Sequence, residues 1–260
     1  MRLNVLRADP AGNITLFVLD PVSHAERAAI AARLMALPGS DVEQVGFVRT
    51  PLRGGDGRME MAGGEFCGNA ARAFGMLTAQ RLGNAAQVQV EVSGCEPLVP
   101  VEVDWTAGTA RARMPLPRAV RRTEAGGCSG TLVDLTGIAH FVVEDIPPTL
   151  DFFQQAEPLF RNIPELGAYG VMFLDTQRGI MTPLVKVPAS GTLVWEGSCG
   201  SGTLAAAVAQ SQTAPDGLFV RDYIQPAGTV QAAILRQQSE TASAWIGGPV
   251  SLAPPAEVEL

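Results

Sequence analysis

The strongest constraint in this sequence is a motif that occurs twice. The first copy, at residues 63–73, reads GGEFCGNAARA, and the second, at residues 195–205, reads WEGSCGSGTLA. In each copy a short polar or Gly-rich approach leads to a Cys-Gly-polar step, and an apolar run rich in alanine follows. The two cysteines, Cys67 and Cys199, are 132 positions apart (199 − 67) in a chain of 260 residues. Because this spacing is about half of the chain, it predicts two copies of one structural unit that face each other.

The run after each cysteine predicts a buried helix, at residues 70–82 and 203–210. Both runs are rich in alanine and leucine and are small or apolar nearly all round, which is typical of a helix enclosed by its own half of the protein. Each cysteine then lies at a helix N-terminus, where the first N–H groups lack helical partners and carry partial positive charge. Such an end can hold a substrate carboxylate, and it favours the thiolate form of the cysteine.

Two thiols that face each other are suited to moving a proton at a carbon next to a carboxylate. One cysteine, as thiolate, removes the proton, and the other, as thiol, returns a proton to the opposite face. This chemistry requires no metal and no organic cofactor. The alternative is that both cysteines are small buried hydrophobic residues, and their repetition at half-chain separation disfavours it.

Residues 65–69 and 198–203 resemble the two active-site motifs of the diaminopimelate-epimerase-like superfamily of cofactor-independent racemases and epimerases. The resemblance covers nearly the whole chain. Residues 9–15, 61–70 and 195–203 are most similar to its histidine racemase branch, which supplies D-histidine for staphylopine-type metallophores. The resemblance implies an α+β fold of two pseudo-symmetric halves, each a curved sheet wrapped around a buried central helix, with the ligand in the cleft between the halves.

The predicted elements divide into an N-terminal half, residues 1–117, which carries Cys67, and a C-terminal half, residues 118–260, which carries Cys199. Prolines, a basic cluster and glycines at residues 115–130 predict a linker between them. Residues 137–143 correspond to residues 12–18, so the order of strands and helices repeats. In the first half, residues 23–37 are predicted to form an amphipathic surface helix that begins with a capping box of Ser23 and Glu26.

The resemblance makes Cys67 and Cys199 the catalytic residues. The residues that it places around the substrate are Asn13, Glu65, Gly68, Asn69, His140, Glu196, Gly200 and Ser201. Among these, Glu65 and Glu196 are expected to contact the ammonium or the side chain of the substrate, and His140 is expected to line the pocket without acid–base work. From the residues alone, Asn13 also fits an ordinary turn and Glu196 a solvated charge at the end of a strand.

The sequence also bears on the substrate. Diaminopimelate epimerases hold the second carboxylate of their substrate with a Glu-Arg pair shortly before the second cysteine, and here Ser190 and Gly191 occupy that place. Because an unpaired buried carboxylate is very costly, loss of the arginine should exclude that substrate. The resemblance therefore indicates histidine. Racemases of diaminopimelate or proline type and a non-catalytic binding protein of the same fold stay open, whereas the phenazine-biosynthesis isomerases of similar fold lack the two-cysteine arrangement.

Composition excludes several other classes of protein. Hydrophobic residues make up 47% and charged residues 17% of the chain, which is typical of a compact globular protein. The net charge of −7 argues against nucleic acid or an anionic membrane as a partner. The first residues lack an apolar signal core, and the four cysteines form no CxxC pair. We therefore expect a cytoplasmic protein with reduced thiols and a small amino-acid substrate, and both a monomer and a homodimer stay open.

Overall fold

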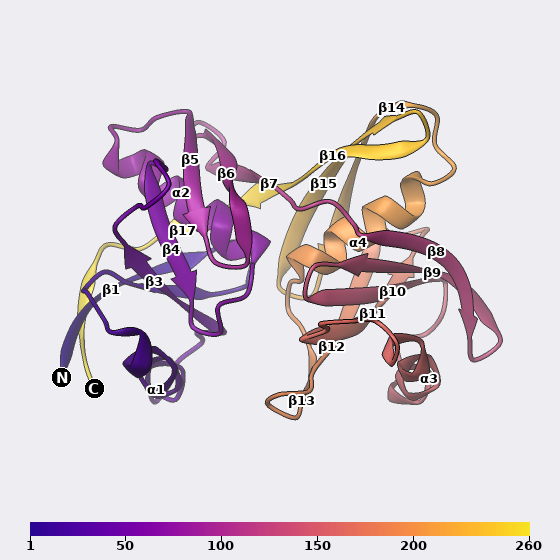
Figure 1. Cartoon of the computed structure of the whole chain (residues 1–260), viewed down its shortest axis with the longest axis horizontal. Helices are drawn as coiled ribbons and strands as arrows, with labels where there is room; N and C mark the ends of the chain where they lie inside the picture. The colour runs from indigo at the N-terminus through magenta and orange to yellow at the C-terminus, as the bar shows by residue number, and fades with distance from the viewer. The chain divides into compact units, whose positions relative to one another are not determined.

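The computed structural model describes all residues from Met1 to Leu260 and divides into two compact units (Figure 1). Unit 1 contains Met1–Arg113 and Gly247–Leu260, and unit 2 contains Met114–Ile246. The end of the chain belongs to unit 1 because its last strands pair with the first strand of the protein. The predicted N-terminal half, residues 1–117, does not include this C-terminal segment, Gly247–Leu260.

Unit 1 is a mixed sheet with two helices. Its elements are, in chain order, β1 (Arg2–Asp9), β2 (Thr15–Val18), α1 (His24–Met35), β3 (Gln44–Arg49), β4 (Gly57–Met61), α2 (Gly68–Arg81), β5 (Gln87–Val92), β6 (Cys95–Asp104), β7 (Thr109–Arg113), β17 (Ser251–Leu252) and β18 (Ala256–Glu259). Neighbouring strands from β1 to β7 pair in chain order, and β17 and β18 pair with the other edge of β1. The pairs β2–β3 and β4–β5 are parallel, because a helix connects each of them and returns the chain to the same end of the sheet.

Unit 2 repeats this scheme. Its elements are, in chain order, β8 (Ala119–Ala125), β9 (Cys128–Leu135), β10 (Ile138–Glu144), α3 (Leu150–Ala156), the 3₁₀ helix η1 (Glu157–Phe160), β11 (Ala168–Asp175), β12 (Ile180–Val187), β13 (Thr192–Trp195), α4 (Gly200–Ser211), β14 (Gly217–Gln225), β15 (Gly228–Gln237) and β16 (Glu240–Pro249), whose last residues belong to unit 1. The pairs β10–β11 and β12–β14 are parallel, and the pairs β9–β10, β11–β12 and β14–β15 are antiparallel. The same alternation as in unit 1 confirms the internal repeat that the duplicated motif predicts.

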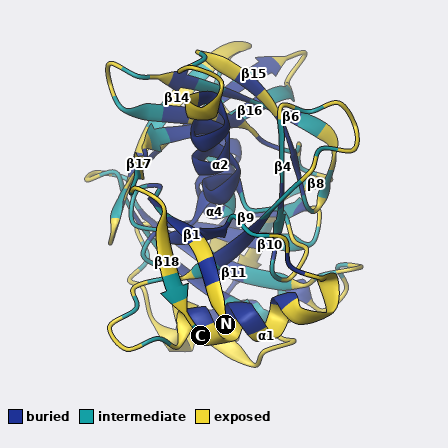
Figure 2. Ribbon diagram, turned by 90° about the vertical axis from the view of Figure 1, so that its left-hand side faces the viewer, coloured by how far each residue is buried: buried dark blue, intermediate teal, exposed yellow.

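A buried helix forms the core of each unit. Strands β4 to β7 pack against α2, and strands from both ends of the unit 2 sheet, β9 to β11 and β14 to β15, pack against α4. Both helices are buried along nearly their whole length, whereas α1 is buried on one face only (Figure 2). Small side chains explain this enclosure, because strands can approach a helix of alanine and glycine from several sides. The α+β fold with one central helix in each half is therefore confirmed. No helix of the protein is both long enough and apolar enough to span a bilayer.

Two local predictions are wrong. The predicted linker at residues 115–130 is mostly an antiparallel hairpin of β8 and β9, in which Ala125 pairs with Cys128 across a Gly-Gly turn. Both turn glycines have positive φ, 58° and 72°, which is the geometry that such two-residue turns require. At α1 the capping box does not form. The hydroxyl of Ser23 donates to the Glu26 carboxylate at 2.5 Å and caps no backbone N–H.

Gly75 provides a test of the close packing between α2 and β6. A Cβ atom at this position would lie 2.5 Å from Cβ of Val101, which is fully buried on β6. Alanine favours a helix over glycine by about 1 kcal/mol, but such an overlap should outweigh this gain. We expect Gly75→Ala to lower the free energy of unfolding by about 1 kcal/mol or more, measured by urea denaturation.

The matched control is the double variant Gly75→Ala/Val101→Ala. Removal of the two methyl groups of Val101 relieves two of the three close contacts of the new methyl group. The double variant should therefore lose less stability than the sum of the two single variants. Additive losses would show that helix and strand are not in the contact described.

Candidate active site

Cys67 caps the N-terminus of α2. Its backbone is extended, with φ −124° and ψ 115°, and its carbonyl oxygen accepts the N–H of Ala71 at 2.8 Å. Its sulfur accepts the N–H of Ala70, with an Sγ–N distance of 3.4 Å. Side chains at this position ordinarily satisfy one of the free N–H groups of a helix with an oxygen atom. Here a thiol does so, and the packing of α2 therefore fixes the position of the sulfur.

Cys199 caps α4 in the same way. Its backbone has φ −116° and ψ 108°, its sulfur accepts the N–H of Gly202 at 3.3 Å, and its carbonyl oxygen accepts the N–H of Thr203 at 2.9 Å. Gly202 is required for this geometry, because a Cβ at that position would contact Sδ of Met172 and lie 3.1 Å from the Cys199 sulfur. Each copy of the motif thus presents a cysteine sulfur at the start of a buried helix.

The prediction that the pKa of the two thiols is lowered, in favour of the thiolate, is wrong. Burial raises the pKa of Cys67, and the charge of Glu65 adds to the rise, although the N–H groups of Ala70 and Asn69 act in the opposite direction. Burial also raises the pKa of Cys199, well above its ordinary value. The charge of Glu196 and a hydrogen bond to its side chain add to that rise. Loss of hydration therefore outweighs the helix N–H groups, and both cysteines are thiols in the free protein.

A network of polar side chains surrounds Cys67 on the β2–β3 side. Oδ1 of Asn13 lies 3.9 Å from the Cys67 sulfur and accepts the Nε2–H of Gln44 at 2.6 Å. Gln44 also donates to Oγ1 of Thr15 at 2.9 Å, and Nδ2 of Asn13 donates to Glu43 at 2.6 Å. The orientation of the Asn13 amide is therefore fixed from both sides. Sequence reasoning missed Glu43 and Gln44, which enter the site through the parallel register of Thr15 with Gln44.

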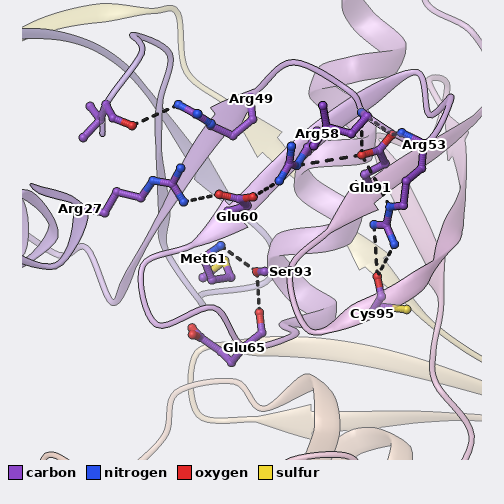
Figure 3. Close-up of polar contacts among 12 residues, drawn as sticks. Arg27, Arg49, Arg53, Arg58, Glu60, Met61, Glu65, Glu91, Ser93 and Cys95 are labelled. Carbon is purple, nitrogen blue, oxygen red and sulfur yellow. Dashed lines mark hydrogen bonds and ion pairs between the residues drawn. The ribbon is translucent and has the colours of Figure 1, made fainter. Parts of the chain in front are cut away.

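The loop that leads to Cys67 is held by the β5–β6 turn. The hydroxyl of Ser93 donates to the carbonyl oxygen of Glu65 at 2.7 Å and accepts the N–H of Met61 at 2.9 Å, so it joins the two ends of the loop (Figure 3). Gly94 lies so close to the backbone N of Phe66 that any Cβ would overlap it. The side chain of Glu65 is exposed. The loop is thus anchored through its backbone, which leaves this carboxylate available to a ligand.

A pocket of about 450 Å³ is lined in part by that turn, at Ser93 and Gly94, and its lining does not include Cys67. Its charged lining forms a chain of ion pairs in which Arg58 lies between Glu60 and Glu91 (Figure 3). The buried carboxylate of Glu91 also accepts the N–H groups of Leu52 and Arg53, at 2.9 and 2.5 Å. These side chains therefore fasten the β3–β4 loop.

Arg72 is a further residue that sequence reasoning missed. It is fully buried in the first turns of α2, where its Nε donates to Oδ1 of the buried Asn69 at 3.2 Å. Its Nη1 donates to the carbonyl oxygens of Gly248 and Pro249, at 3.0 and 2.9 Å. Burial lowers the pKa of Arg72 to about 10, so it stays charged at neutral pH. The returning end of the chain thus helps to hold the start of α2. In the sequence, the signal that could have identified this residue is a lone arginine in an otherwise apolar helical run.

In unit 2 the side chain of Ser201, like that of Glu196, lies beside Cys199. Its hydroxyl lies 3.5 Å from the Cys199 sulfur and 2.8 Å from Nε2 of His140. His140 is fully buried, and burial lowers its pKa to about 3, so its imidazole is neutral at physiological pH. Glu196 is half-buried, and its backbone N–H donates to the carbonyl oxygen of Pro183 at 3.1 Å.

The predicted residues therefore gather in two groups. Unit 1 holds Cys67 with Asn13, Glu65, Gly68 and Asn69, and unit 2 holds Cys199 with His140, Glu196, Gly200 and Ser201. No group of three or more His, Cys, Asp or Glu side chains with the arrangement of a metal site is found.

Solved structures share this fold. A phenazine biosynthesis protein of the PhzF family from Bacillus anthracis matches with a TM-score of 0.73 at 14% identity, over 100% of both chains. A hydroxyproline epimerase from Agrobacterium vitis matches with a TM-score of 0.64 at 13% identity, over 100% of this chain and 93% of that one. At these identities the likeness establishes the fold, which is that of PhzF-like and proline-racemase-like proteins.

Sequence comparison is more specific. Residues 2–257 match the family described as "Histidine racemase CntK N-terminal domain". A histidine racemase of Staphylococcus aureus is 29% identical over 232 residues, which cover 85% of each chain. A histidine racemase of Fusobacterium nucleatum is 26% identical over 276 residues, which cover 96% of this chain and 94% of that one. The chain belongs to this histidine racemase family.

His140 provides a test of the burial described around Cys199. Its pKa is about 3 in the folded protein, against an ordinary value of 6.5. The unfolded chain therefore binds a proton first, and the folded state loses stability as the pH falls from about 6.5 toward 3. Between pH 7 and pH 4.5 we expect wild type to lose about 2 kcal/mol more than His140→Gln, measured by urea denaturation.

The other histidine of the chain, His24, is exposed on α1 and supplies the control. His24→Gln should keep the pH dependence of wild type. The same pH dependence in wild type and His140→Gln would contradict a buried, neutral His140.

Proposed function

We propose that this protein is a cofactor-independent histidine racemase in which Cys67 and Cys199 are the two acid–base groups. The observation that carries the proposal is the repeated helix cap: in a chain of the histidine racemase family, each of two matching units presents a cysteine sulfur at the N-terminus of its buried helix. The N–H groups at these helix ends, those of Gly68 and Asn69 and those of Gly200 and Ser201, are suited to bind the substrate carboxylate.

The reaction moves one proton off the α-carbon and another onto it. The thiolate of one cysteine takes the α-proton and becomes a thiol, which leaves an electron pair on the α-carbon. The thiol of the other cysteine gives its proton to the opposite face of that carbon and becomes a thiolate. The product is the other enantiomer, and the two cysteines have exchanged protonation states. Exchange with solvent resets them, and the reverse reaction uses the same groups.

The raised pKa of both thiols bears on how such a reaction begins. In the free protein the carboxylates of Glu65 and Glu196 oppose the thiolate form of the neighbouring cysteine. A substrate ammonium or imidazolium group beside either carboxylate offsets that charge, and so lowers the pKa of the thiol when the substrate binds. We assign this contact to Glu65 and Glu196. Asn13 presents an amide to the substrate beside Cys67, and the neutral His140 lines the site beside Cys199.

The substrate assignment rests on two supports. The family and both relatives are described as histidine racemases. In addition, Ser190 and Gly191 offer no charge for a second carboxylate, since Ser190 lies in the exposed β12–β13 turn and hydrogen-bonds Val187 and Thr192. Diaminopimelate and proline are therefore less favoured, as is a binding protein without activity. Supply of D-histidine for a metallophore and a cytoplasmic location are part of the proposal.

The decisive variants are Cys67→Ser and Cys199→Ser. A serine hydroxyl is far less acidic than a thiol and cannot serve as base at neutral pH, and general acid–base catalysis contributes about 10²- to 10⁴-fold. We expect each variant to lose at least about 100-fold of the rate of D-histidine formation from L-histidine, measured by chiral chromatography.

The matched controls are Cys95→Ser and Cys128→Ser. Both are half-buried free cysteines, and their thiols bond the nearby carbonyl oxygens of Pro97 and Gly126. These variants should keep the wild-type rate. Full activity in Cys67→Ser or in Cys199→Ser would refute the two-cysteine mechanism. If the protein racemises L-proline or epimerises LL-diaminopimelate and does not act on histidine, the assignment of histidine as the substrate is wrong.

A further inference from the structure

The backbone of Cys199 is held by the side chain of Gln225, at the end of β14. The N–H of Cys199 donates to Oε1 of Gln225 at 2.7 Å, and Nε2 of Gln225 donates to Oγ1 of Thr203 at 2.9 Å. The hydroxyl of Thr203 donates to the carbonyl oxygen of Cys199 at 2.7 Å. All three residues are buried: Gln225 is 4% and Thr203 0% exposed.

The backbone N–H of Cys199 determines which atoms of this ring donate and which accept. A backbone N–H can only donate, so the atom of Gln225 that faces Cys199 must be its amide oxygen. Its NH₂ group then faces Thr203, whose oxygen must accept. The remaining proton of that hydroxyl is directed to the carbonyl oxygen of Cys199. Both polar groups of the Cys199 backbone are therefore satisfied by one closed ring of hydrogen bonds.

Unit 1 lacks this ring, although it has the same frame: a cysteine that caps a buried helix, followed by a strand and a hairpin turn. Ala71 stands four residues after Cys67, where Thr203 stands after Cys199. Val92 is the last residue of β5 before its hairpin turn, as Gln225 is the last residue of β14. The two turns correspond in a further contact, because each binds the carbonyl oxygen two residues before its cysteine: Ser93 binds that of Glu65, and the N–H of Ala227 binds that of Gly197. The ring is thus particular to Cys199.

We propose that Gln225 is a positioning residue for Cys199, with Thr203 as its bridge. The inference rests on the proposed function, because it assigns the purpose of the ring to proton transfer by Cys199. The ring fixes the extended backbone of Cys199, and this keeps the sulfur 3.3 Å from the N–H of Gly202. Because the sulfur is attached to this backbone, a turn of the Cys199 backbone moves it away from that N–H. Misplacement of a reacting group lowers the rate of the chemical step far more than it changes binding.

Gln225→Met tests the proposal, since methionine has similar length and no amide. We expect kcat for L-histidine to fall by about 10- to 100-fold, with KM within about threefold of wild type. The matched control is Gln210→Met near the far end of α4, where Gln210 donates to Glu144 at 2.9 Å and accepts the hydroxyl of Tyr223 at 2.9 Å. This control removes the same kind of amide bridge and should leave kcat unchanged. Wild-type kcat in Gln225→Met would overturn the proposal, as would an equal loss in both variants.

Thr203 provides the conservative rescue and a check that does not depend on how Gln225→Met folds. Thr203→Ser keeps the bridging hydroxyl and should keep most of kcat. Thr203→Val has the shape of threonine without the hydroxyl and should lose kcat to a similar extent as Gln225→Met, with the loss in the double variant no larger than in either single one. A role in folding alone would predict comparable kcat in Thr203→Ser and Thr203→Val.

A readout without substrate separates this proposal from the proposed function. The hydrogen bond from Gly202 stabilises the thiolate of Cys199, so its loss should move the pH midpoint of Cys199 alkylation by iodoacetamide upward in Gln225→Met. The groups that titrate near this sulfur are Glu196 and, through Ser201, His140, and the substitution leaves them in place. Cys67 on the same molecule is the internal reference, and peptide mass spectrometry reads both sites.

If wild type racemises no amino acid, the proposed function fails, and the upward shift at Cys199 alone still supports the positioning role. If wild type racemises histidine and Gln225→Met shifts neither kcat nor the Cys199 midpoint, the positioning role fails and the proposed function stands.

Discussion

The free N-terminus of a helix buried inside its own sheet is the constraint on which both units depend. A helix that strands enclose from several sides needs small residues where the strands approach it, and both α2 and α4 are rich in alanine and glycine. Its first N–H groups then lie away from water and need acceptors. A cysteine sulfur supplies one of them in each unit. The packing that forms the core therefore also fixes the position of the atom that we propose as the base.

The same constraint explains the raised pKa of both thiols. The enclosure that positions the sulfur removes water from it, and a carboxylate lies nearby in sequence, Glu65 before Cys67 and Glu196 before Cys199. A free protein with two protonated thiols is protected from adventitious oxidation and alkylation, because the thiolate is the reactive form. In the proposed mechanism, a cationic substrate supplies the charge that offsets these carboxylates.

The two units share a frame and differ in what surrounds the sulfur. Around Cys67 the polar groups come from the β2–β3 edge, where Asn13 and Gln44 lie. Around Cys199 they come from Ser201 with His140, and from Gln225 with Thr203. The two sulfurs therefore lie in different polar surroundings, although each caps its helix in the same way.

Much of the fold was predictable from the duplicated motif, because its half-chain spacing and apolar runs determine two units with central helices. The β8–β9 hairpin was missed although Gly126-Gly127 is a known turn signal, since arginines and glycines resemble a linker. Gln44 and Gln225 enter the two sites only through the pairing of strands. The carbonyl partners of Arg72 come from the returning chain end. No local pattern records either arrangement. The direction of the thiol pKa shift was wrong because a motif shows the helix end but not the extent of burial.

The most direct test of the central claim is the position of deuterium during the first few per cent of reaction in D₂O, with L-histidine as substrate. Two bases on opposite faces predict that the D-histidine formed carries deuterium at the α-carbon, whereas the remaining L-histidine keeps its α-proton, as read by proton NMR and chiral separation with mass spectrometry. D-Histidine that retains the α-proton of the substrate would mean that one group removes and returns the same proton. That result would contradict a mechanism shared between Cys67 and Cys199.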